Sequence, residues 1–156
     1  MPKMQKQDLL ACHQKIKPYL HRTPVLTSRL LDHLSGAELY FKCENLQRMG
    51  AFKMRGAMHA VLNLSAEQQQ KGVVTHSSGN FAQAIALAAQ TLGIQAYIVM
   101  PSNAPAVKKR AVADYGGRIT ECQPTLQARE AAANQIIRET GASFLHPFDD
   151  NDVILG

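Results

Sequence analysis

The sequence contains few cysteines, and their spacing excludes two kinds of site. Cys12, Cys43 and Cys122 are odd in number and far apart, and no Cys-x-x-Cys or Cys/His ligand spacing occurs. We therefore expect neither a disulfide framework nor a structural zinc site, and we assign no metal ligands. Free thiols are typical of a reducing compartment, so the sequence predicts a cytoplasmic protein.

Long apolar runs are also lacking. No stretch approaches the roughly 20 apolar residues that a membrane-spanning helix requires. The polar N-terminal segment, residues 1–6, has no apolar signal core. We therefore expect no membrane partner.

Two nucleotide-binding motifs are absent, namely G-x-G-x-x-G and G-x-x-x-x-G-K-[ST], so a dinucleotide or Walker-type site has little support. A net charge of +5 with a pI of about 9.3 raises the alternative of nucleic-acid binding. The basic residues are scattered, however, and the densest run, residues 108–110, fits a solvated helix face. We therefore expect no nucleic-acid partner, because a mildly basic surface also suits anionic cofactors and amino-acid carboxylates.

The pattern of apolar residues predicts an α/β protein. With 156 residues, 46% of them hydrophobic, the chain can fill one sizeable core. The first part predicts helices over 5–17, 28–34 and 52–64 and a strand over 39–43. From residue 72 strands and helices alternate, which indicates βαβ units in an open, twisted parallel sheet of about four strands, preceded by an N-terminal helical arm. The strands are expected over 73–76, 96–100, 118–122 and 143–145, and the helices over 81–92, 106–114 and 126–139.

The turn S-S-G-N (residues 77–80) falls between a predicted strand and a predicted helix. Ligands bind at this edge of parallel sheets, and the backbone N–H groups and dipole of the helix favour an anion. Gly79 allows close approach of the backbone, and the Ser and Asn side chains add donors. An ordinary helix cap with a tight turn explains these four residues equally well.

The segment G-A-F-K-M-R-G-A (residues 50–57) places Lys53 where a loop becomes a helix. Most lysines in such places are simply solvated. Here, glycines flank the segment and Phe52 offers an apolar cover that would favour a neutral amine. Imine formation and proton abstraction both require a neutral amine. Together with the turn at 77–80, Lys53 indicates pyridoxal-phosphate chemistry on an amino acid.

Several segments, in the same order, resemble the fold-type-II pyridoxal-phosphate enzymes. The resemblance covers essentially the whole chain and is strongest to the branch that contains threonine/serine dehydratase, serine racemase and threo-3-hydroxyaspartate dehydratase. The cysteine-synthase branch is less similar. The segments that carry the resemblance are residues 41–47, 50–57, 75–80, 82–83, 100–101, 104–105, 108, 115–116 and 146–149.

This resemblance implies a role for each candidate site residue. Lys53 would carry the cofactor as an internal aldimine and then remove the α-proton of the substrate. Ser78 would act as acid or base on the opposite face of the substrate. Around the cofactor would lie Phe52, Asn80, which would bond the 3-oxygen of its ring, and Phe148. The substrate carboxylate would be held by Ser77, Ser78, Gly79, Asn80 and Phe81.

Two positions depart from commoner versions of these motifs. Ala51 stands where serine is frequent, and Phe81 stands where histidine is frequent. Neither change removes an atom that the lysine chemistry needs, but Phe81 could alter substrate preference.

The resemblance implies dehydration and deamination of hydroxy-amino acids such as L-threonine or L-serine. Racemisation by Lys53 and Ser78 is an alternative, because the same residues serve both outcomes. A shortened, non-catalytic fragment that binds only a ligand or a partner is a further alternative.

Family members are longer than this chain, and their second half supplies a glycine-rich loop for the cofactor phosphate. We expect an arm with part of a large domain (1–50), a small α/β domain (51–150) and the start of a crossover (151–156). The isolated chain should therefore retain the cofactor weakly and be inactive alone. Exposed apolar residues on the side of the missing large domain would favour self-association, and we expect a homodimer.

Overall fold

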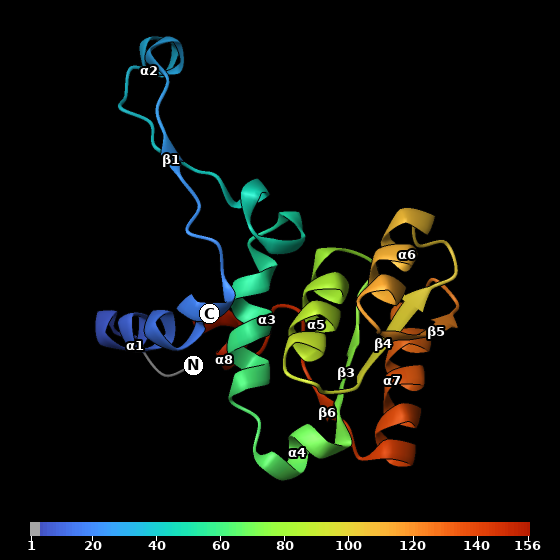
Figure 1. The fold of residues 1–156 in the computed structure, drawn as a ribbon. Coiled ribbons are helices and arrows are strands. Elements are labelled where there is room, and N and C mark those ends of the chain that lie inside the picture. Colours follow the sequence, from blue (N-terminus) through green and yellow to red (C-terminus); the bar gives the residue numbers. More distant parts are fainter. Residues whose placement is uncertain (1–3) are drawn as a thin grey trace.

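The computed structural model describes residues 4–156, which form an α/β body with a projecting arm (Figure 1). Four strands build a parallel sheet in the order β5-β4-β3-β6, which confirms the predicted fold class. They are β3 (Val73–His76), β4 (Ala96–Pro101), β5 (Arg118–Cys122) and β6 (Ser143–Phe144).

Helices cover both faces of this sheet. Side chains alternate along each strand, so Val73 and Ile98 join one apolar cluster while Val74 and Val99 join another. The first cluster includes residues of α5 (Asn80–Thr91) and α6 (Ala106–Asp114), and the second includes residues of α7 (Leu126–Thr140). Strand β3 is buried along its whole length, as expected for a parallel strand covered on both faces.

Two further helices complete the body next to α5. Helix α3 (Lys53–Leu62) packs against α5, and α8 (Asn151–Leu155) packs against α3. Neither α8 nor the short α4 (Ala66–Lys71) was predicted. Helix α4 begins with a capping box, in which the Gln68 N–H donates to the Ser65 hydroxyl and the Ser65 N–H donates to the Gln68 side chain.

The N-terminal part differs more from the prediction. Helix α1 (Lys6–Ile16) continues into the 3-10 turn η1 (Lys17–Tyr19), and α2 (Arg29–Ser35) is capped as expected by Ser28 and Gly36. The predicted strand 39–43 shrinks to β2 (Phe41–Lys42), which pairs antiparallel with β1 (Val25–Leu26). A two-residue strand is too short to show a periodic pattern, which is why β1 was missed. Two more 3-10 turns, η2 (Glu44–Leu46) and η3 (Arg48–Gly50), lead into α3.

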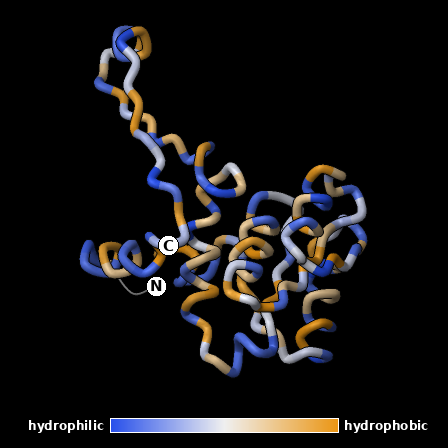
Figure 2. Tube along the Cα trace, viewed as in Figure 1, coloured by the Kyte–Doolittle hydropathy of each residue, from blue (hydrophilic) through white to orange (hydrophobic). Residues whose placement is uncertain are grey.

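The arm carries little of the core. Figure 2 shows hydrophobic stretches along this projecting segment, and α1 exposes Leu9 and Leu10 in the way expected from the sequence. The exposed apolar side chains of the arm include Val25, Leu26, Leu30, Leu34, Tyr40 and Phe41.

Within residues 4–156, no helix combines the length and apolarity needed to cross a bilayer.

The crossing of α3 and α8 depends on the absence of a side chain at Gly56. A Cβ there would collide with the carbonyl oxygen of Val153 and lie 3.1 Å from its Cγ1. We expect Gly56→Ala to lower the free energy of unfolding by about 2 kcal/mol, as overpacking does. Urea unfolding measures this change. A more stable variant would contradict the close packing, because helix propensity alone favours alanine by about 1 kcal/mol.

Candidate active site

The strand order creates a crevice at one edge of the sheet. From β3 the chain passes through α5 to β4 on one side, whereas β6 lies on the other side of β3 and is reached through α7. Open parallel sheets bind ligands at such a switch point, beyond the carboxyl ends of the strands. The segments that leave the sheet here are 77–80 after β3 and 145–148 after β6.

A cavity of about 470 Å³ lies at this switch point. Its walls come from the start of α3, the turn after β3, the first turns of α7 and the loop after β6. The structure therefore brings the two predicted segments, Lys53 and the turn at 77–80, to one cavity. Of the predicted site residues, the lining includes Phe52, Lys53, Ser77, Ser78, Asn80, Phe81 and Phe148.

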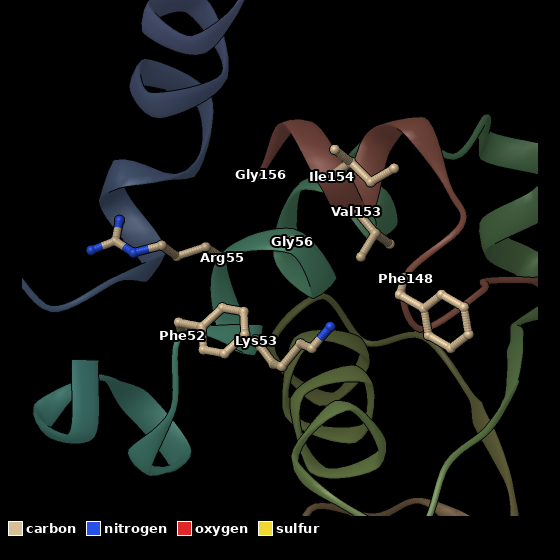
Figure 3. A pocket seen from close by; sticks show the side chains of 8 residues that line it. All are labelled: Phe52, Lys53, Arg55, Gly56, Phe148, Val153, Ile154 and Gly156. Carbon is tan, nitrogen blue, oxygen red and sulfur yellow. The ribbon is translucent and has the colours of Figure 1, made fainter. Parts of the chain in front are cut away.

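Lys53 extends from the first turn of α3 toward the loop that carries Phe148 (Figure 3). Its Nζ donates a hydrogen bond to the carbonyl oxygen of Pro147 at 2.7 Å. The same nitrogen lies 5.4 Å from the ring centroid of Phe52 and 5.6 Å from that of Phe81. Phe52 is 58% exposed and Phe81 only 3%, so the apolar cover that the sequence assigned to Phe52 is shared with Phe81.

A second cavity, of about 230 Å³, is also lined by Lys53. It shares Phe52, Lys53 and Phe148 with the larger one and is closed by α8 (Figure 3). The lysine side chain therefore lines two adjoining spaces.

The turn after β3 presents a backbone that a ligand can approach. The Ser77 N–H still donates to Val99 as part of the sheet, and the Gly79 N–H donates weakly to the Ser77 hydroxyl at 3.3 Å. A Cβ at Gly79 would meet nothing within 4 Å. Gly79 is the N-cap of α5 and no described side chain caps this end, so the first N–H groups of the helix are available to an anion.

Asn80 is already engaged by a residue to which the sequence assigned no role. Its Oδ1 accepts a hydrogen bond from Lys108 Nζ of α6 at 2.8 Å. This contact orients the amide and places a cation beside the turn. Lys108 lies in the predicted helix 106–114, but nothing in the sequence indicated that its side chain would reach the neighbouring turn.

Other residues of the cavity were also missed. Arg129 and Glu130 reach it because α7 begins at the same edge of the sheet. The Nε atom of Arg129 is buried and has no hydrogen-bond partner in the described part of the chain. Burial, and secondly the nearby His146, lower the pKa of His76, which favours its neutral form. The remaining unpredicted lining residues are Leu126, His146 and Pro147.

A partly buried ion pair anchors the arm to the start of α3. Arg55 donates to both carboxylate oxygens of Glu44, each at 2.8 Å, and the Thr23 hydroxyl donates to one of them at 2.6 Å. These bonds, first those from Arg55, lower the pKa of Glu44 from 4.5 to about 2. The network fixes the backbone two residues after Lys53.

We expect Glu44→Gln to lower the free energy of unfolding by about 1–2 kcal/mol at neutral pH, allowing for partial solvent screening. Because the folded-state pKa is the lower one, this stabilisation is fully present above about pH 4.5 and is lost as the pH falls toward 2. Urea unfolding at several pH values checks the loss. Glu67, whose pair with Lys71 is solvent-exposed, is the matched control, and Glu67→Gln should change little. Equal effects of the two changes would contradict this account.

Comparisons with known proteins agree with this geometry. The family model described as pyridoxal-phosphate dependent enzyme matches residues 16–156. Serine racemase from Arabidopsis thaliana is 54% identical over 92% of this chain and 44% of its own length. Beta-hydroxyaspartate dehydratase from Paracoccus denitrificans is 51% identical over 96% of this chain and 48% of its own length.

Solved structures show the same fold. The crystal structure of serine racemase from Dictyostelium discoideum aligns with a TM-score of 0.92 at 47% identity, covering 96% of this chain and 49% of that one. The processed form of threonine deaminase isoform 2 from Solanum lycopersicum aligns with a TM-score of 0.83 at 35% identity, covering 98% and 46%. The chain spans about half the length of the curated relatives it matches.

Proposed function

The chain belongs to the family of pyridoxal-phosphate dependent enzymes. We propose that it carries the part of an active site that contains the reactive lysine, for β-elimination from hydroxy-amino acids such as L-serine or L-threonine. One observation carries the proposal: the amine of Lys53 and the open turn at 77–80 line the same cavity at the switch point of the sheet. The names of the relatives, which include a dehydratase and an ammonia-lyase, support it.

The residues of this chain fit the cofactor. Among the described residues that line the cavity, Lys53 alone carries a primary amine, which can form an imine with an aldehyde, and the ring centroids of Phe52 and Phe81 lie 5.4 and 5.6 Å from its nitrogen. When bound, pyridoxal phosphate withdraws electrons from the attached amino acid and so acidifies its α-proton. We assign Phe148 and Asn80 to the wall beside the cofactor, with Asn80 oriented by Lys108.

Substrate orientation falls to the turn after β3. The free N–H groups at the start of α5 and the hydroxyls of Ser77 and Ser78 can hold the substrate carboxylate, and Gly79 leaves room for it. With pyridoxal phosphate bound, the amine of Lys53 would be placed to take the α-proton of a substrate whose carboxylate the turn holds. The overall reaction would convert the hydroxy-amino acid into a keto acid and ammonia.

Racemisation is the second candidate. It is favoured by the similarity to serine racemases and by the position of Ser78 in the cavity with Lys53. In this alternative Ser78 returns a proton to the face opposite the one from which Lys53 removed it. Assays of protein purified from its natural source, with L-serine, L-threonine and 3-hydroxyaspartate, decide between the two. Keto acid and ammonia support elimination, and D-serine supports racemisation. If none of these products formed, the result would contradict the proposed function.

The cavity also indicates a preference among substrates. Arg129 contributes a guanidinium whose Nε lacks a partner within the described residues, and such a group suits a second carboxylate. One relative is a hydroxyaspartate dehydratase. We therefore propose that 3-hydroxyaspartate is a better substrate than serine.

We expect Arg129→Gln to lower kcat/KM for 3-hydroxyaspartate by about 100-fold, the loss expected when one partner of a desolvated charge pair is removed. The value for serine should fall by no more than about threefold, because serine has no second carboxylate to pair. Arg138, which is exposed near the end of the same helix, provides the control, and Arg138→Gln should alter neither value. Equal losses for both substrates would refute the role of Arg129.

The remaining expectations stay predictions. They are a homodimer, a cytoplasmic location, and the division into an arm with part of a large domain (1–50), a small domain (51–150) and the start of a crossover (151–156). The exposed apolar side chains of the arm are compatible with burial against further protein.

A further inference from the structure

The loop after β6 has an unusual relation to Lys53. It contains the sequence H-P-F-D (residues 146–149), and its contact with the lysine is made by a backbone atom, the carbonyl oxygen of Pro147. A backbone acceptor can hold the amine at one place only if the peptide group that carries it is itself fixed. The question is therefore what orients the peptide between Pro147 and Phe148.

The other end of that peptide is bound by a histidine. The Phe148 N–H points toward His146 Nδ1, with a nitrogen-to-nitrogen distance of 3.4 Å. The next N–H, that of Asp149, donates to the same Nδ1 at 2.8 Å. In a trans peptide the C=O and N–H point in opposite directions, so an acceptor on the N–H side directs the oxygen the other way. His146 therefore turns the carbonyl of Pro147 toward Lys53.

The ring of His146 is held in place by its neighbours. It packs edge-on against Phe148, with centroids 4.5 Å apart, and against His76 at 5.9 Å. Because two N–H groups point at Nδ1, this atom must present its lone pair, and a neutral ring carries its proton on Nε2. His76, Arg129, Glu130 and Lys53 are the titratable groups that line the cavity with it.

We propose that His146 is a positioning residue for Lys53, acting through the Pro147–Phe148 peptide. Whenever the amine is free, the oriented carbonyl receives it and keeps it inside the cavity instead of letting the flexible side chain move into solvent. Hydrogen bonds in such a chain polarise one another, so donation by the Phe148 N–H makes the Pro147 oxygen a better acceptor. The contacts between His146, the Pro147–Phe148 peptide and Lys53 exist without a cofactor. Only their importance for catalysis rests on the proposed function of Lys53.

The test measures the reactivity of the Lys53 amine directly. The protein is treated with formaldehyde and cyanoborohydride, and the rate of methylation of each lysine is followed by mass spectrometry of its peptides. Lys71, which lies on α4 outside the cavity, is the internal reference. His146→Phe keeps an aromatic ring but removes the acceptor. His146→Asn keeps a short acceptor for the following N–H groups but removes the ring.

We expect His146→Phe to raise the methylation rate of Lys53 relative to Lys71 about fivefold, the factor that one net hydrogen bond supports. His146→Asn should stay within about twofold of the original protein, since the acceptor remains. An unchanged rate in His146→Phe would overturn the proposal. A rise in His146→Asn would also overturn it, because loss of ring packing would then be the cause. That result would count even if His146→Phe did not fold. Methylation requires no pyridoxal phosphate, so failure of the proposed function would leave this result standing.

Discussion

Replacing Lys53 with alanine is expected to abolish covalent attachment of pyridoxal phosphate and to lower turnover by about 1000-fold or more, since one group supplies both the nucleophile and the base. Loss of the side chain removes the hydrogen bond to Pro147, and the lysine is only half-buried. Stability should therefore change little. Turnover of hydroxy-amino acids is compared between the variant and the original protein, each produced in and purified from the natural host.

Lys53→Arg is the matched control for charge. An arginine can still donate to the Pro147 carbonyl, but its guanidinium forms no stable imine and stays protonated. We expect it to be as inactive as Lys53→Ala. Substantial activity in either variant would mean that another lysine provides the amine.

Replacing Ser78 with alanine should separate the two candidate reactions. If the protein racemises serine, the hydroxyl returns the proton on the far face, and its loss should lower racemisation by about 100-fold or more, the contribution of one general acid. Elimination needs proton removal by Lys53 alone and should fall by less than about tenfold. Formation of D-serine and formation of pyruvate from L-serine, measured in the same sample, give the two rates.

Ser77→Ala provides the comparison. This neighbouring hydroxyl is assigned only to the substrate carboxylate, which both reactions must bind, so both rates should fall by the same factor. If Ser78→Ala behaved in the same way, lowering the two rates equally, Ser78 would be a carboxylate ligand and not the second acid.

The regular part of the fold was predictable because its signals are local and strong. Strands β3 and β5 and helix α6 match their predicted bounds, and β4, β6, α5 and α7 differ from theirs by one residue at one or both ends. The order of the strands was not predictable, because apolar patterning shows that a strand is buried but not which neighbour it pairs with. The placement of β6 beside β3 is set by the tertiary structure, and it brings α7 to the cavity.

The residues of the candidate site likewise fall into a group that the sequence predicted and a group that only the fold reveals. Lys53 and the turn at 77–80 were found because each is a compact motif at the boundary of an element. The contact of Lys53 with Pro147 was not found, since a backbone carbonyl has the same chemistry at every residue and only the fold selects one. Arg129 was missed for a related reason: the helical pattern identified its helix but not the surroundings of its first turn.

The most direct test of the account is the site at which the cofactor attaches. Pyridoxal phosphate is added, the mixture is reduced with borohydride so that even a weakly held imine is trapped, and the modified lysine is identified by peptide mass spectrometry. The account predicts a phosphopyridoxyl group on Lys53 in preference to every other lysine, and its suppression by an amino acid that competes for the cofactor. Modification spread over exposed lysines, with Lys53 no more reactive than Lys71, would contradict it.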